Sequence, residues 1–211
     1  MAEARRTRAN GEASRERILD AATEITGERG YEGTSISLVS KRSGLPASSI
    51  YWHFKDKDEL VAAVIDRSYT RWMAELERPV PVPFGAGRDE LFRLMAHRIG
   101  SALATFPDFL RLGLMLVLEK RPEELTARAR FVEVRQTVGR RIQEVWAAFF
   151  PELGPADIEQ LVMLTFVMAD GLFIANQTQP LDLSGSFDLL ATAISATAAQ
   201  IAHQAASATR D

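Results

Sequence analysis

The sequence predicts an all-α protein of about nine helices. Apolar residues recur with helical spacing along almost the whole chain, and no segment shows the alternation typical of a half-buried strand. Prolines and glycines interrupt this pattern where helices are expected to end. The chain has 211 residues, of which 46% are hydrophobic and 25% charged, so a sizeable core can form.

Composition excludes several kinds of site. There is no cysteine, which rules out disulfides, thiolate metal sites and cysteine nucleophiles. The three histidines, His53, His97 and His203, are too scattered to suggest a metal cluster. The sequence also lacks a phosphate-binding glycine loop and the spacing of a catalytic triad. We therefore expect no metal, no cofactor and no enzymatic activity.

Nothing in the chain predicts membrane insertion. The N-terminus lacks the apolar stretch of a secretory signal. The most apolar window, residues 161–175, is interrupted by Thr165, Asp170 and Gly171. Because a spanning helix needs about 20 predominantly apolar residues, we expect a buried helix and a cytoplasmic protein.

The N-terminal part is predicted to hold a tail and three helices. Residues 1–13 are polar and basic, and we interpret them as a flexible tail. Serine and threonine are good N-caps, proline suits the first helical turn, and glycine commonly ends a helix. The helices are expected from Ser14 to Gly30, from Thr34 or Ser35 to Gly44, and from Pro46 to about His53.

The later helices are delimited by a capping motif, a loop and several prolines. Residues 56–59 match an Asp-x-x-Glu capping box and open a helix over residues 58–77. Residues 78–87 contain three prolines and two glycines and therefore form a loop. Beyond it we predict helices over residues 88–105, 108–120, 122–150, 155–177 and 184–207.

Residues 34–54 contain two short helices joined by a tight turn, as in a helix-turn-helix motif, whose second helix enters the major groove. Helical hairpins are common, so a bundle without DNA contacts is the alternative. The second helix can be anchored by Ile50 and Phe54. Its other side chains are hydroxyls and aromatics, and lysines follow it; such groups contact phosphates, sugars and thymine methyls. These candidates are Ser48, Ser49, Tyr51, Trp52, His53, Lys55 and Lys57.

The stretch from Ser14 to Leu60 resembles the DNA-binding domain of the TetR (tetracycline-repressor) family. The matching residues are Ile18, Leu19, Ala21 and Ala22 in the first helix, Gly30, Tyr31, Thr34 and Ser35 at its exit, Gly44 and Leu45 at the turn, and the run from Ser49 to Lys55 with Lys57 and Leu60. The resemblance implies an N-terminal three-helix DNA-binding domain and a C-terminal helical domain that binds a ligand and dimerises.

The resemblance also implies roles by position. Ser35 would cap the second helix and touch a phosphate. Backbone contacts would come from Ser49, Tyr51, His53 and Lys57, and base or sugar contacts from Ala47, Ser48 and Trp52. Family members often carry long polar side chains at the positions of Ser37 and Ala47, and both are small here. Specificity would therefore draw on thymine methyls, DNA shape or the tail arginines Arg5, Arg6 and Arg8.

Two predicted helices suggest a homodimer. The helix over residues 155–177 is apolar nearly all round, so it must be covered on both sides. The last helix carries an apolar stripe and several small alanines. The expected interface residues are Leu161, Leu164, Met168, Leu172, Leu190, Ile194, Ala198 and Ile201. The alternative is that both helices are central in a monomeric bundle.

The C-terminal part is rich in aromatic residues and methionine. These residues could form a packed core or line a cavity for a small apolar effector. The candidates for the cavity are Trp72, Met95, Phe109, Met115, Trp146, Phe150, Phe166, Asp170 and Phe173. Asp170 is the one charge in an apolar stretch, and it would either orient the effector or pair with a structural partner across the dimer.

We therefore expect a dimeric transcriptional repressor that binds a palindromic double-stranded DNA operator, associates with the nucleoid when bound, and is released by an apolar or amphipathic small molecule. Its predicted parts are the tail over residues 1–13, the helix-turn-helix domain over 14–57 and the ligand-binding and dimerisation domain over 58–211, with helix 58–77 as the connection. The alternative is a helical small-molecule carrier or enzyme without DNA binding.

The charge distribution bears on this interpretation. The net charge of −3 argues against a nucleic-acid partner when the chain is taken as a whole. Residues 1–57, however, carry ten basic and eight acidic residues, so this part has a charge of +2 and the remainder −5. No acidic residue lies between Gly33 and Lys55, where DNA is expected.

Overall fold

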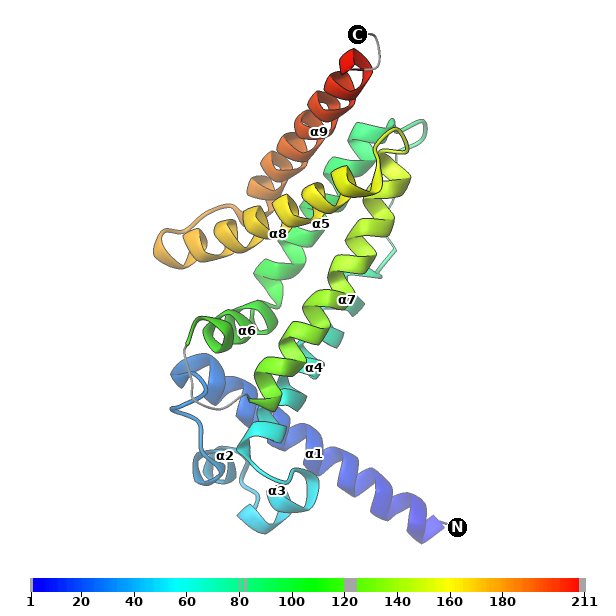
Figure 1. Ribbon diagram of the computed structural model, residues 1–211. Coiled ribbons are helices and arrows are strands. Elements are labelled where there is room, and N and C mark those ends of the chain that lie inside the picture. The colour runs from blue at the N-terminus through cyan, green and yellow to red at the C-terminus, as the bar shows by residue number, and fades with distance from the viewer. Residues whose placement is uncertain (1, 80, 82, 120–124, 209–211) are drawn as a thin grey trace. The chain divides into compact units, whose positions relative to one another are not determined.

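The computed structural model describes residues 2–79, 81, 83–119 and 125–208, and side chains from residue 9 to residue 207 within these ranges. The described residues form nine α-helices and no strand (Figure 1), as predicted. The helices are α1 (Ala2–Arg29), α2 (Ile36–Ser43), α3 (Ala47–His53), α4 (Lys57–Leu76), α5 (Arg88–Thr105), α6 (Asp108–Leu118), α7 (Thr126–Phe149), α8 (Pro155–Thr178) and α9 (Leu183–Ala208).

The N-terminal segment differs from the prediction of a flexible tail, because α1 is helical from Ala2. Alanine, arginine and glutamate, which dominate this segment, are good helix formers even where no apolar stripe marks the helix. The side chains of Arg5, Arg6 and Arg8 lie outside the described residues, so their predicted role stays a prediction.

The chain divides into two compact units. The first comprises Met1–Arg71 and Asp108–Val134, and the second comprises Trp72–Pro107 and Arg135–Asp211. This division differs from the predicted boundary at residue 57, because most of α4, all of α6 and the start of α7 group with the N-terminal helices.

Ion pairs and caps explain why the first unit extends beyond α3. The Asp58 carboxylate on α4 accepts hydrogen bonds from the backbone N–H groups of Thr126 (2.6 Å) and Ala127 (3.1 Å) in the first turn of α7. An anion here satisfies free N–H groups and favours the positive end of the helix dipole. One turn further along α7, the Arg130 guanidinium pairs with Asp66 of α4.

In the second unit, α9 packs along α5 and α8 packs on α9. Gly100 of α5 permits the close approach, since a Cβ there would lie 2.9 Å from the Leu183 carbonyl oxygen of α9. An aromatic cluster lies around Phe92, whose ring meets that of Trp146 edge to face at 4.8 Å and that of Phe150 at 6.1 Å. Such pairs add to the stability gained by burying the rings.

Candidate nucleic-acid interface

The turn between α2 and α3 is held by groups from three segments. Gly44 ends α2 with φ of 67° and ψ of 21°, a left-handed conformation that glycine adopts without steric cost. The Arg17 guanidinium of α1 donates to the Ser43 carbonyl (2.7 Å), and the Ser40 hydroxyl donates to the Leu45 carbonyl (2.7 Å). These bonds fix the direction in which α3 leaves the turn.

The start of α2 has the cap that the sequence predicts. The Ser35 hydroxyl accepts a hydrogen bond from the Leu38 backbone N–H at 3.3 Å. The hydroxyls of Ser35 and Ser37 lie 3.0 Å apart, and Ser37 is exposed. Two hydroxyls therefore lie together at an accessible helix N-terminus, a position suited to a phosphate.

The short helix α3 has one buried and one exposed side. Ile50 is 0% exposed and Phe54, which follows the last turn, is 3% exposed, so both anchor the helix as predicted. Tyr51 and Trp52 are 56% and 76% exposed, which is unusual for large aromatic residues. Ser48 is also exposed, and Ala47 and Ser49 are partly exposed. The structure thus brings the predicted base-facing and sugar-facing residues onto one accessible surface.

The two lysines after α3 are held differently. Lys55 is exposed, and its backbone N–H donates to the Glu59 carboxylate (2.6 Å) at the start of α4. The Lys57 ammonium lies 4.1 Å from the centre of the Tyr31 ring, donates to the Tyr31 carbonyl (3.3 Å) and is 3.8 Å from a Glu32 oxygen. These Lys57 contacts join residues far apart in the chain, so no local sequence pattern predicts them.

His53 at the end of α3 has an altered proton affinity. Burial, together with the positive charge of Arg15, lowers the pKa of this histidine below its ordinary value. The Trp52 ring meets the imidazole edge to face, with ring centres 4.5 Å apart. The Arg15 guanidinium lies over the Phe54 ring, 5.3 Å from its centre. Arg15 was not among the predicted site residues, because it lies on α1, far from α3 in sequence.

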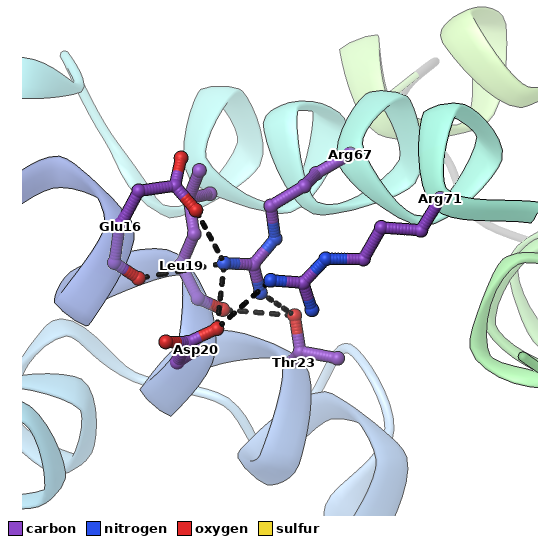
Figure 2. Close-up of polar contacts among 6 residues, drawn as sticks. All are labelled: Glu16, Leu19, Asp20, Thr23, Arg67 and Arg71. Carbon is purple, nitrogen blue, oxygen red and sulfur yellow. Dashed lines mark hydrogen bonds and ion pairs between the residues drawn. The ribbon is translucent and has the colours of Figure 1, made fainter. Parts of the chain in front are cut away.

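Behind this surface, α1 and α4 are joined by a network of arginines and acids (Figure 2). The Arg67 guanidinium, whose side chain is 10% exposed, binds the carboxylates of Asp20 (2.8 Å) and Glu16 (3.3 Å) and the Thr23 hydroxyl (2.6 Å). Arg71 reaches the same Asp20 oxygen at 3.3 Å. Glu16 and Asp20 of α1 are therefore neutralised by α4, and these pairs hold α1 in place.

The predicted ligand-binding residues do not all fall in one unit. Phe109 and Met115 belong to the first unit, where the Phe109 ring packs between those of Tyr69 and Phe131. The other seven belong to the second unit. There the Trp146 indole N–H donates to the Thr165 hydroxyl at 3.0 Å. These contacts agree with the alternative of a packed core for Phe109 and Trp146.

Asp170 has its partner within the same chain. The Arg135 guanidinium of α7 binds both of its carboxylate oxygens, at 2.8 and 2.7 Å. Arg135 also lies over the Phe166 ring, 4.2 Å from its centre. The expected partner across a dimer is therefore wrong, since a bidentate pair inside one chain already neutralises the charge.

The exposed apolar surface of α8 differs from the predicted interface. Met163 and Val167 are 62% and 63% exposed, and Ile174 lies on the same side of the helix. By contrast, four predicted interface residues are buried within the single chain, which corrects that part of the prediction: Leu161, Leu190, Ile194 and Ala198. An apolar stripe identifies a covered face, but it does not identify what covers it. Leu164, Met168, Leu172 and Ile201 are partly exposed.

By length and composition α8 could also cross a membrane, and this property is shared by core and interface helices of soluble proteins. In the single chain, only one side of α8 is covered, which differs from the expectation of a fully buried helix.

Comparison with known proteins shows which family the segment that carries α3 is similar to. The family model described as "Bacterial regulatory proteins, tetR family" matches residues 18–64. Over 101 residues the chain is 35% identical to the HTH-type transcriptional regulator AcrR of Shigella flexneri, a match that covers 47% of this chain and 46% of that protein. The chain thus spans less than half the length of this curated relative.

Solved structures show the same fold over most of the chain. A transcriptional regulator of the TerR/AcrR family from Aquifex aeolicus VF5 has a TM-score of 0.66 at 21% identity, with 86% of this chain and 98% of that chain covered. The regulator FadR from Bacillus subtilis, solved in complex with stearoyl-CoA, has a TM-score of 0.63 at 19% identity, with 85% and 96% covered. These matched proteins are regulators, in agreement with the expectation that the chain is not an enzyme. Residues 18–64 of this chain are therefore similar to the tetR family of bacterial regulatory proteins.

Proposed function

We propose that this protein is a transcriptional repressor that binds a palindromic operator as a homodimer and leaves it when an amphipathic small molecule binds. The observation that carries the proposal is the exposed side of α3, where Tyr51 and Trp52 lie beside serine hydroxyls. Exposing two large aromatics is unfavourable for a free surface, whereas it suits contact with sugars and base edges in a major groove.

The apolar side of α8 supports the dimer. Met163, Val167 and Ile174 form a stripe of the kind that a second copy would cover. A two-fold dimer would present two copies of α3 to two half-sites about 34–36 Å apart. Such a protein would work in the cytoplasm and lie on the nucleoid while bound to DNA.

The connection between the units supports control by a ligand. The helix α4 belongs to both units, since Arg71 falls in the first and Trp72 in the second. An effector that binds the second unit more tightly in one conformation would shift the population of that conformation and, through α4, the position of α3. A relative of the same fold holds stearoyl-CoA, and an acyl chain with a polar group suits the aromatic residues of this unit.

The proposal is tested by selection of random duplex DNA with the purified protein, followed by a charge change on α3. Ser48→Asp places a carboxylate where bases and phosphates are expected, and at the first turn of a helix it should favour folding. Ser48→Asn is the uncharged control of similar size. We expect Ser48→Asp to lose at least about 30-fold in affinity, on the order of 2 kcal/mol, as for a lost base contact with added repulsion.

The outcomes separate this function from the alternative. Enrichment of a palindrome that Ser48→Asp no longer binds, while Ser48→Asn retains most of the affinity, supports the repressor. If the wild-type protein selects no sequence and shows no salt-dependent affinity for DNA, the chain is a carrier or another helical module instead.

A further inference from the structure

We infer that Arg15 of α1 binds a DNA phosphate beside the C-terminal end of α3, which extends the DNA interface beyond the helix-turn-helix. This inference rests on the proposed function and adds a contact to it. The ligand is one phosphodiester group of the duplex backbone, and the contact is independent of sequence.

Arg15 differs from three arginines near it in having no acidic partner among the described residues. Arg42 pairs with Glu24 at 2.7 Å, and Arg67 and Arg71 pair with Asp20. Within the part of the chain that the structure describes, no carboxylate lies in ion-pair distance of Arg15, and Glu16, its neighbour on α1, is paired with Arg67. Arg15 is therefore a cation next to α3 that the fold has not neutralised.

The aromatic contact positions the Arg15 guanidinium without using its hydrogen-bond donors. A cation over an aromatic ring is attracted by the ring itself, so its N–H groups remain available for another partner. Phe54 is buried directly after the last turn of α3 and so provides a fixed support. A planar fork of N–H donors held in this way matches the geometry of a phosphate.

The neighbouring groups reinforce the same preference for an anion. The positive charge of Arg15 reaches the imidazole of His53 and contributes to the lowered pKa of that residue. Lys55, two residues further on, is exposed. Two cations and a histidine therefore lie at one end of α3. An anion among them would relieve their repulsion, and duplex DNA supplies anions as its backbone phosphates.

The test measures how the affinity of the full-length protein for its selected duplex falls with added salt. We expect Arg15→Gln to reduce the slope of log affinity against log salt by about 0.9, the value for one phosphate contact. The matched control is Arg93→Gln, which removes one exposed positive charge from α5 in the other unit. This variant should keep the wild-type slope.

A second variant separates charge from packing. Arg15→Lys keeps the charge and should retain the wild-type slope, because one cation still faces the phosphate. The inference is overturned if Arg15→Gln keeps the wild-type slope, or if Arg15→Lys loses as much as Arg15→Gln, which would indicate a packing role. In both cases DNA binding by the wild type leaves the proposed function standing. If the wild type binds no duplex, both the proposed function and the Arg15 contact are wrong.

Discussion

The helices α3 and α8 both expose large apolar side chains, but their surroundings differ. On α3 the exposed Tyr51 and Trp52 follow two serines and precede an exposed lysine, and Arg15 lies at the end of the helix. On α8 the exposed Met163 and Val167 continue with Ile174 along one side of the helix, and the charge of Asp170 is already neutralised.

This difference indicates two kinds of partner. Aromatic rings beside hydroxyl donors and unpaired cations suit duplex DNA, because DNA offers apolar contacts at its bases and negative charge at its phosphates. An apolar stripe without free charge suits another apolar surface, as in the core of a dimer interface. The nature of the exposed residue therefore says less about its partner than the charges around it do.

The largest effect is expected from adding a charge to the α8 stripe. Val167→Glu would place two unpaired carboxylates in a two-fold interface, at a cost on the order of 3 kcal/mol or more. The dissociation constant of the dimer, measured by analytical ultracentrifugation, should rise at least about 100-fold. Val167→Thr, which has the same shape without charge, should change it little. A native dimer in Val167→Glu would show that this stripe has another partner.

A smaller effect, on stability, is expected from replacing Asp170. This substitution tests whether the Asp170 carboxylate stabilises the fold or binds the effector. Asp170→Asn leaves the half-buried Arg135 without its carboxylate, so the free energy of unfolding should fall by about 1.5–3 kcal/mol. The melting temperature should fall by several degrees. Asp188→Asn, which disturbs only a 3.4 Å contact with exposed His97, should stay within about 0.5 kcal/mol. Unchanged stability with altered release from DNA by an acyl effector would instead assign Asp170 to the ligand.

The smallest effect is expected from His53, which should make binding by α3 dependent on pH. Burial and the charge of Arg15 lower the pKa of His53 in the free protein, while a nearby phosphate favours its protonated form and so raises the pKa in the complex. Binding then takes up protons between the two pKa values. Affinity for the duplex should rise as pH falls through this window, by at most about tenfold for each unit of pKa difference.

The measurement for His53 is affinity between about pH 5 and 8, across the range where histidine titrates. His53→Gln should flatten this part of the profile. A wild-type affinity that stays constant, or that falls as the pH is lowered while the protein remains folded, would contradict a phosphate near His53.

Features set by local sequence were predicted well. The bounds of α2 and α3 agree with the structure within one or two residues, because Ser35, Gly44 and Pro46 define the ends through their own backbone and capping preferences. The exposed side of α3 also follows from helical spacing once Ile50 and Phe54 are assigned to the core.

Features that depend on pairing between distant residues were missed. Arg67 and Asp20 are 47 residues apart, and Arg135 and Asp170 are 35 apart. No local pattern indicates which acid a given arginine will meet, since that depends on how helices pack. For the same reason Leu161 and Ile194 were predicted at the dimer interface, although both are buried by their own chain.

The caps and ion pairs of α4 set a condition for building hybrid regulators from this protein. A transplant of residues 1–57 alone would leave Glu16 and Asp20 without Arg67 and Arg71. A recombination point just after Arg71, with α6 and the start of α7 carried along, would keep these bonds and the Asp58 cap of α7 in the same graft. Any exchange of sensing modules between relatives would then need three crossover points, after Arg71, before Asp108 and after Val134.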